Sequence, residues 1–148
     1  MSHSKYDALK LENQLCFPLY AAAREVVKKY RPHLDAIGLT YTQYITMMVL
    51  WERREITVKA LGELLFLDSG TMTPVLKSLE AKGYVTRQRS AADERSVTVL
   101  LTETGAALRD IAVDIPAKIA GCVGLDADEA TLLYRLLYKL LYTEKPKN

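Results

Sequence analysis

Apolar residues return every three or four positions over most of the chain, and this spacing predicts a largely helical protein. The first such stretch runs from about Tyr6 to Tyr30, and Pro32 and Gly38 are expected to interrupt it. A second helix is expected to begin at Thr40, because Thr40 and Gln43 have the spacing of a capping box.

Two short helical segments follow, "TVKALGELLF" and "SGTMTPVLKSLEAKG", joined by a turn at "LDSG". Thr57 can cap the first segment. The second is expected to begin near Gly70 or Thr71, because Pro74 is tolerated where a backbone N–H has no helical partner. Gly83 is a natural C-terminal stop.

The period then changes to that of a β-strand. "YVTRQR" and "SVTVLLT" are rich in β-branched residues and flank the polar "SAADER", which predicts a hairpin with strands near residues 84–89 and 96–101. A helix should run from about Thr102 towards Gly121, with a kink at Pro116. The last helix should run from about Asp126 to Tyr142, capped by Asp126 with Glu129 three positions on.

This order predicts a mainly α fold with a small β-hairpin wing, which is a winged helix-turn-helix. We expect one domain over residues 1–148, with the DNA-binding part at about 40–102 and dimerisation helices at about 6–35 and 103–143. The last helix, "EATLLYRLLYKLLY", carries more apolar surface than one face of a monomer needs. It is either a deeply buried core helix or, the reading we favour, packs with the first helix against a second subunit.

Composition narrows the class of protein. Hydrophobic residues make up 49% of the chain and charged residues 26%, as in soluble globular proteins, and no apolar run is long enough for a membrane span. The polar N-terminus "MSHSKYDALKLENQ" lacks the apolar region of a signal peptide, so we expect a cytoplasmic protein. The spacing of cysteines and histidines indicates no metal site and no cofactor.

Candidate DNA-binding residues lie on the second short helix and the hairpin. That helix can enter the major groove, where hydroxyls and a lysine reach phosphates or base edges. Arginines at a protruding hairpin suit a narrow minor groove. A solvated basic surface is the simpler alternative, but the ordered combination favours DNA. We expect Asp93 to orient Arg87 or Arg95. The candidates are Ser69, Thr71, Thr73, Lys77, Arg87, Arg89 and Arg95.

The stretch "LDSGTMTPVLKSLEAKGYVTRQRSAADERSVTVLLTETG" resembles the multiple-antibiotic-resistance regulator (MarR) family, including its wing pattern of Asp-x-Arg. The resemblance implies a homodimeric winged-helix repressor that binds pseudo-palindromic operators in double-stranded DNA. It places the family's DNA contacts at Ser69, Thr71, Thr73, Lys77, Arg87 and Arg95.

"LENQLCFPLYAAAREVVKKY" followed by "LTYTQYITMMVLWE" is similar to the organic hydroperoxide resistance regulator (OhrR) branch of that family. The similarity implies that an organic hydroperoxide oxidises Cys16, with loss of repression. It also implies that Tyr30 and Tyr41 hydrogen-bond the thiol, one or both from across the dimer. Phenolic donors can stabilise a thiolate. An apolar surround would admit an organic peroxide, and we expect it from Phe17, Leu19, Met47 and Met48.

Several alternatives stay open. Cys122 resembles a late cysteine that resolves the oxidised thiol in some members, but a low-molecular-weight thiol could do so instead. At Pro18 either the helix kinks across Cys16 or it starts near Pro18 with Cys16 just before it; the resemblance favours the kink. Cys16 could also be buried filler in a repressor released by a small phenolic or carboxylate ligand. A thiol peroxidase is disfavoured, because the arginine-tipped hairpin has no place in it.

Overall fold

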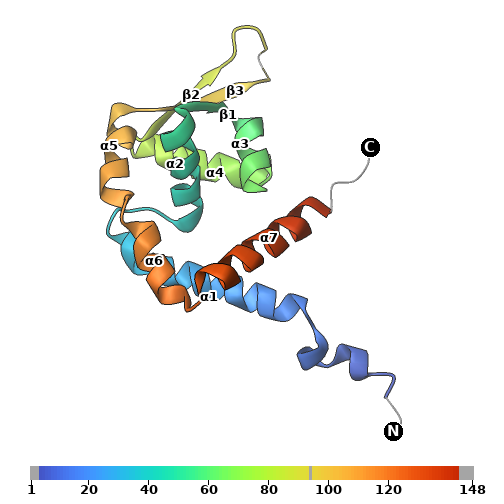
Figure 1. The fold of residues 1–148 in the computed structure, drawn as a ribbon. Coiled ribbons are helices and arrows are strands. Elements are labelled where there is room, and N and C mark those ends of the chain that lie inside the picture. The colour runs from blue at the N-terminus through green and yellow to red at the C-terminus, as the bar shows by residue number, and fades with distance from the viewer. Residues whose placement is uncertain (1–3, 94, 144–148) are drawn as a thin grey trace.

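A computed structural model describes residues 4–93 and 95–143 of the chain (Figure 1). Two short 3-10 turns precede the first α-helix, and a three-stranded antiparallel sheet lies near the top of Figure 1. The α-helices are α1 (Cys16–Asp35), α2 (Tyr41–Arg53), α3 (Val58–Leu65), α4 (Ser69–Ala81), α5 (Glu103–Ala112), α6 (Ile115–Val123) and α7 (Ala127–Thr143), and the strands are β1 (Glu55–Thr57), β2 (Val85–Arg89) and β3 (Val97–Leu101).

The sheet and helices α2, α3 and α4 form the winged helix-turn-helix, which confirms the predicted fold class. β2 and β3 pair as the expected hairpin, with Arg87 opposite Val99. β1 was not predicted: its three residues add an edge to the sheet in the order β1-β3-β2, with Ile56 opposite Val99. We call this unit, residues 40–102, the reading head.

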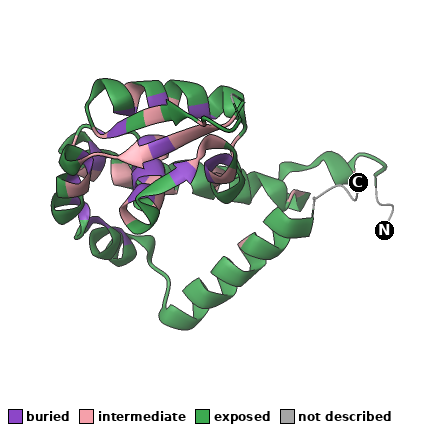
Figure 2. Ribbon diagram, turned by 90° about the horizontal axis from the view of Figure 1, so that it is seen from above, coloured by how far each residue is buried: buried purple, intermediate pink, exposed green. Residues whose placement is uncertain are grey.

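Nearly all buried side chains lie in the reading head and the helices next to it (Figure 2). α5 seals one side of the head at Gly105, where a Cβ would stand 2.2 Å from the carbonyl oxygen of Tyr84. The indole N–H of Trp51 donates to the carbonyl of Gly105 at 2.9 Å. The head therefore shares one continuous core with the end of α1 and with α5 and α6. The most deeply buried members lie in the head and are Met47, Leu50, Leu61, Met72, Leu76, Leu79, Val85 and Val99.

α1 and α7, which we call the arms, are exposed over most of their length (Figure 2), and the C-terminal end of α7 meets the head, where the ring centroid of Tyr142 lies 5.7 Å from that of Phe66. Leu34, near the end of α1, is the one residue of that helix that is buried, and no described residue of α7 is. A deeply buried α7 is therefore wrong for a single copy of the chain. Of the described helices, none is long and apolar enough to cross a membrane.

The first helix begins ten residues later than the expected start at Tyr6. Residues 7–9 and 11–13 are 3-10 turns, and α1 starts at Cys16. The kink expected at Pro18 is absent because Pro18 is the third residue of α1, where the backbone N–H needs no helical partner. Pro32, expected to interrupt the helix, lies inside α1 near its end.

Other boundaries also differ from the prediction. α4 starts at Ser69 with Asp68 as its cap, so "LDSG" is not a separate turn and Pro74 lies inside the helix. The helix expected from Thr102 towards Gly121 is two helices, because Pro116 lies in the first turn of α6 rather than at a kink. The predicted caps at Thr40, Thr57 and Asp126 are confirmed.

Candidate DNA interface and sensor cysteine

α4 is anchored on one side and free on the other. Its apolar stripe of Met72, Leu76 and Leu79 is buried in the core. At its start a carboxylate oxygen of Asp68 accepts a hydrogen bond from the backbone N–H of Thr71 at 2.7 Å, which holds the pKa of that carboxyl below its usual value. The opposite face leaves the four predicted contacts exposed: Ser69, Thr71, Thr73 and Lys77.

Arg87 is held by a residue that the sequence reading missed. Its guanidinium lies 3.1 Å from a carboxylate oxygen of Glu80, and its backbone N–H donates to the other oxygen at 3.1 Å. The same contact lowers the pKa of Glu80. Because the pair joins α4 to β2, it fixes the position of the β2–β3 wing relative to α4, which we call the reading helix. Glu80 and Arg87 are seven positions apart and lie on different elements. Neither helical periodicity nor hairpin pairing therefore predicts their contact from the sequence.

Asp93 acts on the backbone of the wing tip. Its carboxylate accepts a hydrogen bond from the backbone N–H of Arg95 at 3.0 Å, which shapes the turn. The ion pair that orients a wing arginine is instead the one between Glu80 and Arg87. Arg89 and Arg95 are both exposed.

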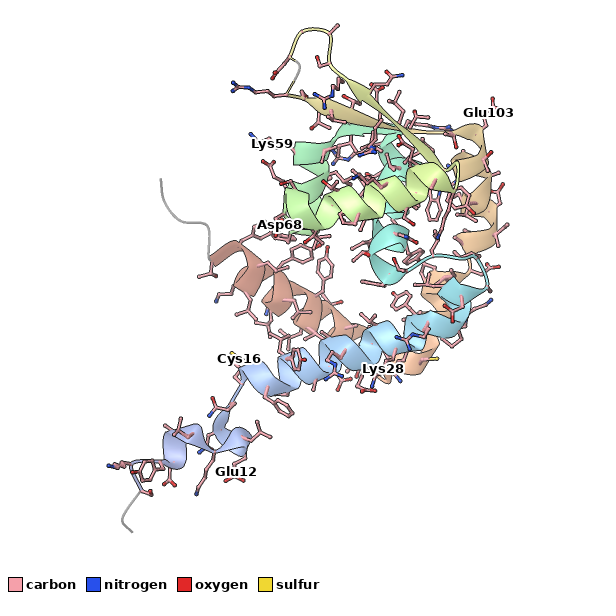
Figure 3. The ribbon with its side chains drawn as sticks, turned by 180° about the vertical axis from the view of Figure 1, so that it is seen from behind. Glu12, Cys16, Lys28, Lys59, Asp68 and Glu103 are labelled. Carbon is pink, nitrogen blue, oxygen red and sulfur yellow. The ribbon has the colours of Figure 1, made fainter. Side chains whose placement is uncertain are left out.

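A cavity of about 840 Å³ lies between α3, α4 and the wing. It brings five of the predicted residues together: Ser69, Thr73, Arg87, Asp93 and Arg95. Thr71, Lys77 and Arg89 are not part of its lining. Lys59 of α3, labelled in Figure 3, also lines it and was not among the predicted residues.

Cys16 is exposed at the first residue of α1, at the end of that helix far from the head (Figure 3). Tyr30 lies fourteen residues further along the same helix, a separation of about 21 Å at 1.5 Å per residue. The expected apolar surround does not form within one chain either, since Met47 is fully buried in the head. The two cysteines, Cys16 and Cys122, are both free and exposed.

The predicted sensor tyrosines form a cluster at the other end of α1. The ring centroids of Tyr30 and Tyr41 are 5.0 Å apart, and Tyr44 lies 5.8 Å from Tyr30. Burial raises the pKa of all three phenols. They therefore stay protonated at neutral pH and can donate hydrogen bonds.

Comparison with known proteins identifies the family. Residues 25–110 match the model of the transcriptional regulators SarA/Rot. The organic hydroperoxide resistance transcriptional regulator of Bacillus subtilis (strain 168) is 51% identical over 145 residues, which cover 98% of this chain and 99% of that protein. The chain belongs to the OhrR branch of the MarR family.

Three solved structures of AbfR from Staphylococcus epidermidis share this OhrR-branch fold. The reduced, DNA-bound form is 34% identical, covers 93% of this chain and 96% of its own, and has a TM-score of 0.76. The disulfide form is 33% identical with the same coverage and a TM-score of 0.64. The overoxidised, DNA-bound form has a TM-score of 0.75, so both DNA-bound forms are closer in shape to the present chain than the disulfide form is.

The OhrR-branch chain is a DNA-binding transcriptional regulator. Regulators of this family are not enzymes, which removes the thiol peroxidase alternative. Within residues 4–93 and 95–143, no group of three or more histidines, cysteines or carboxylates is placed to hold a metal ion.

Proposed function

We propose that the protein is a homodimeric, sequence-specific repressor that senses organic hydroperoxides through Cys16 and then leaves its operator. The observation that carries this proposal is that Cys16 and Tyr30 lie fourteen residues apart on one helix, too far apart to meet within one chain. A two-fold axis makes residue i contact j while j contacts i. Two antiparallel copies of α1 crossing midway between these residues would bring each Cys16 to the partner's Tyr30.

The sequence at that midpoint suits a close crossing. Residues 21–23 are three alanines, and small side chains let helix backbones approach each other. On either side α1 exposes apolar side chains, and α7 exposes more. A large exposed apolar surface marks a protein–protein interface. These side chains are Leu15, Phe17, Leu19 and Val27 on α1, with Leu132, Leu133, Leu136, Leu140 and Leu141 on α7.

The sensing reaction follows from thiol chemistry. The thiolate sulfur of Cys16 attacks the terminal oxygen of the hydroperoxide, the O–O bond breaks, and the departing alkoxide takes a proton to become an alcohol. The sulfur is oxidised to a sulfenic acid and the peroxide is reduced. Neutral Tyr30 and Tyr41 from the partner would donate hydrogen bonds to the thiolate before the reaction.

A second thiol then completes the switch. It attacks the sulfenic sulfur, a disulfide forms, and the hydroxyl leaves as water. The candidates are Cys122, which is exposed and free, and a low-molecular-weight thiol. The existence of a disulfide form of the related AbfR supports this step. We place the protein in the cytoplasm, where thiols start reduced.

Operator binding uses both heads of the dimer. Residues 40–102 form the DNA-binding part and the remaining helices of the single 1–148 domain form the dimer. Ser69, Thr71, Thr73 and Lys77 would read the major groove. The wing arginines would enter the minor groove. Two heads must stand about 34–36 Å apart to meet successive half-sites, so a rotation of one head spoils both contacts.

The test compares wild type with Cys16→Ser on a DNA duplex that the reduced protein selects from a random pool. We expect cumene hydroperoxide to release wild type and to leave Cys16→Ser bound. Release of Cys16→Ser by the peroxide would refute the proposal. Non-reducing electrophoresis and mass spectrometry of wild type and Cys122→Ser decide between the two resolving thiols: a subunit crosslink that disappears in Cys122→Ser identifies Cys122, whereas a single-chain band with the added mass of the thiol on Cys16 identifies a small thiol.

A ligand-released repressor is the second candidate, and one cavity favours it. A pocket of about 350 Å³ lies between α2, α5 and α6, with Tyr44, Met48 and Trp51 on its wall and Arg109 as a cation for a small carboxylate. Benzoate is a suitable probe. If benzoate releases both wild type and Cys16→Ser from DNA, while peroxide releases neither, the ligand candidate replaces the oxidation proposal.

A further inference from the structure

Gln43 is a buried polar residue that sequence analysis treated only as half of a capping box. Its backbone N–H donates to the hydroxyl of Thr40 at 3.3 Å, and its side-chain oxygen accepts from the backbone N–H of Thr40 at 3.0 Å. Local capping therefore uses one side of the amide. Only 7% of the residue is exposed, so the rest of the amide must also find partners inside the protein.

Those partners lie on the reading helix. The amide nitrogen of Gln43 donates to the hydroxyl of Ser78 at 2.9 Å, and the ammonium of Lys82 donates to the amide oxygen of Gln43 at 3.2 Å. Lys82 also donates to the carbonyl of Gly38, which follows α1. Gln43 thus joins the start of α2 to the C-terminal end of α4, and Lys82 extends the network to the segment that follows α1.

The tyrosine cluster stands at the other side of this junction. Tyr41 is the first residue of α2 and directly follows Thr40, while its ring lies 5.0 Å from that of Tyr30. A movement of Tyr41 therefore moves the first turn of α2. That turn is held to α4 through Gln43, so the displacement passes to the helix that carries the DNA contacts.

We propose that Gln43 is the positioning residue that transmits the state of Tyr30 and Tyr41 to the reading helix. The inference rests on the proposed function, because it needs Cys16 oxidation to displace the tyrosines. Reduced Cys16 holds Tyr41, Gln43 holds Ser78 and Lys82, and α4 stays at the angle that fits the major groove. Oxidation releases Tyr41, and the same bonds turn α4 away from the DNA.

Loss of these bonds should uncouple the helix rather than unfold it. α4 keeps its buried stripe of Met72, Leu76 and Leu79 whatever happens at residue 43. We call the hydrogen bonds of Gln43 with Ser78 and Lys82 the relay. A reading head without the relay thus still binds DNA when Cys16 is reduced. Once oxidised, it has lost the connection that would turn α4, so it stays bound.

The experiment measures operator affinity of the full-length dimer before and after cumene hydroperoxide. Gln43→Leu removes the relay at α2. Ser78→Ala combined with Lys82→Met removes it at α4, and this second variant leaves the capping box of Thr40 and Gln43 intact. Thr46→Val is the matched control: Thr46 is fully buried on the same helix, but its hydroxyl donates only to the carbonyl of Thr42. Mass spectrometry verifies that Cys16 is oxidised in every variant.

We expect wild type and Thr46→Val to lose about a hundredfold in affinity on oxidation, within the usual range of coupling between two sites. Both relay variants should match the reduced wild type within about threefold and lose less than about tenfold on oxidation. Full release of the oxidised relay variants overturns the inference, as does weak binding in both states, which would make Gln43 merely structural. Cys16→Ser separates the two proposals: if peroxide still releases it, the sensor and the relay both fail.

Discussion

The reading head and the two arms use the same kinds of residue to different ends. The head buries Met47, Met72 and many of its leucines and valines within one chain, and both side-chain polar atoms of Gln43 are hydrogen-bonded. α7 has leucines in similar density, yet none of its described residues is buried, and Leu136 and Leu140 are 46% and 54% exposed. An apolar side chain that its own chain leaves in water is stabilised only when another surface covers it.

The difference teaches where each part obtains its stability. The head, together with the end of α1 and with α5 and α6, obtains its stability from a core that closes within one chain. The arms expose apolar side chains that a second copy would cover under the proposed function, and the proposed sensor site also needs that copy, since one chain keeps Cys16 and Tyr30 fourteen residues apart on α1. Substitutions that change either the reading head or the arms, but not both, test whether the two regions obtain their stability in these different ways.

The largest effect on stability should come from Gly105→Ala, which disrupts the packing of α5 against the reading head. A Cβ at this position would meet the carbonyl oxygen of Tyr84 at 2.2 Å and a methyl of Leu101 at 2.9 Å, so α5 must move off the head. We expect a loss of about 3 kcal/mol or more in the free energy of unfolding. Thermal unfolding at one fixed protein concentration measures it.

Gly121→Ala in α6 is the matched control, because nothing lies within 4 Å of its Cβ position. This substitution should stabilise the protein by about 0.5–1 kcal/mol. An equal effect of the two substitutions would show that the close approach of α5 to Tyr84 does not hold the head together.

The second effect separates the arms from the head. Leu136→Asp combined with Leu140→Asp places two charges on the exposed face of α7, where burial against a partner would require their desolvation. We expect a folded monomer with a mass near 16.6 kDa and operator affinity at least about a hundredfold weaker, since one head reaches one half-site. Light scattering after gel filtration and DNA titration provide the two measurements.

Lys139→Asp puts the same charge at a polar position of α7 and should keep the dimer. A double variant that still elutes as a dimer with normal DNA affinity would show that α7 is not the dimer surface.

A smaller effect is expected in the head's contact with DNA. Arg87→Ala should weaken operator binding about tenfold, or about 1.4 kcal/mol, and reduce the salt dependence by about one phosphate contact. Glu80→Gln keeps the arginine but loosens its position, so it should cost less. Titrations at two salt concentrations distinguish the two variants; a larger loss for Glu80→Gln would contradict the positioning role.

The smallest effect concerns pH. The hydrogen bond from Thr71 lowers the pKa of Asp68 from its usual 3.8 in the folded state. Stability from this cap is therefore present above pH 3.8 and is lost as pH falls through the lower, folded-state pKa. Asp68→Asn keeps a cap that does not titrate. Its melting temperature should lie below that of wild type at pH 6, and the difference should shrink as the pH falls below 3.8 and through the lowered, folded-state pKa of Asp68; a constant difference would contradict this account.

Several features were predictable from the sequence because they depend on residues close in the chain. Thr40 with Gln43 and Asp126 with Glu129 satisfy helix ends three positions away, and both caps are confirmed. The hairpin follows from alternating β-branched residues on either side of a polar turn. The boundaries near Pro18, Pro74 and Pro116 were wrong because a proline excludes only an N–H bond and does not by itself decide where the helix begins.

What the sequence determined by itself is the set of local elements, the winged helix-turn-helix order and the family, since these depend on short spacings and on motif residues. The tertiary structure decided which distant residues meet. It paired β1 with β3, Glu80 with Arg87, and Gln43 with Ser78 and Lys82, and it kept Cys16 away from Tyr30 within one chain. Such contacts depend on how the whole chain packs, because any long-range pair competes with all others for the same buried space.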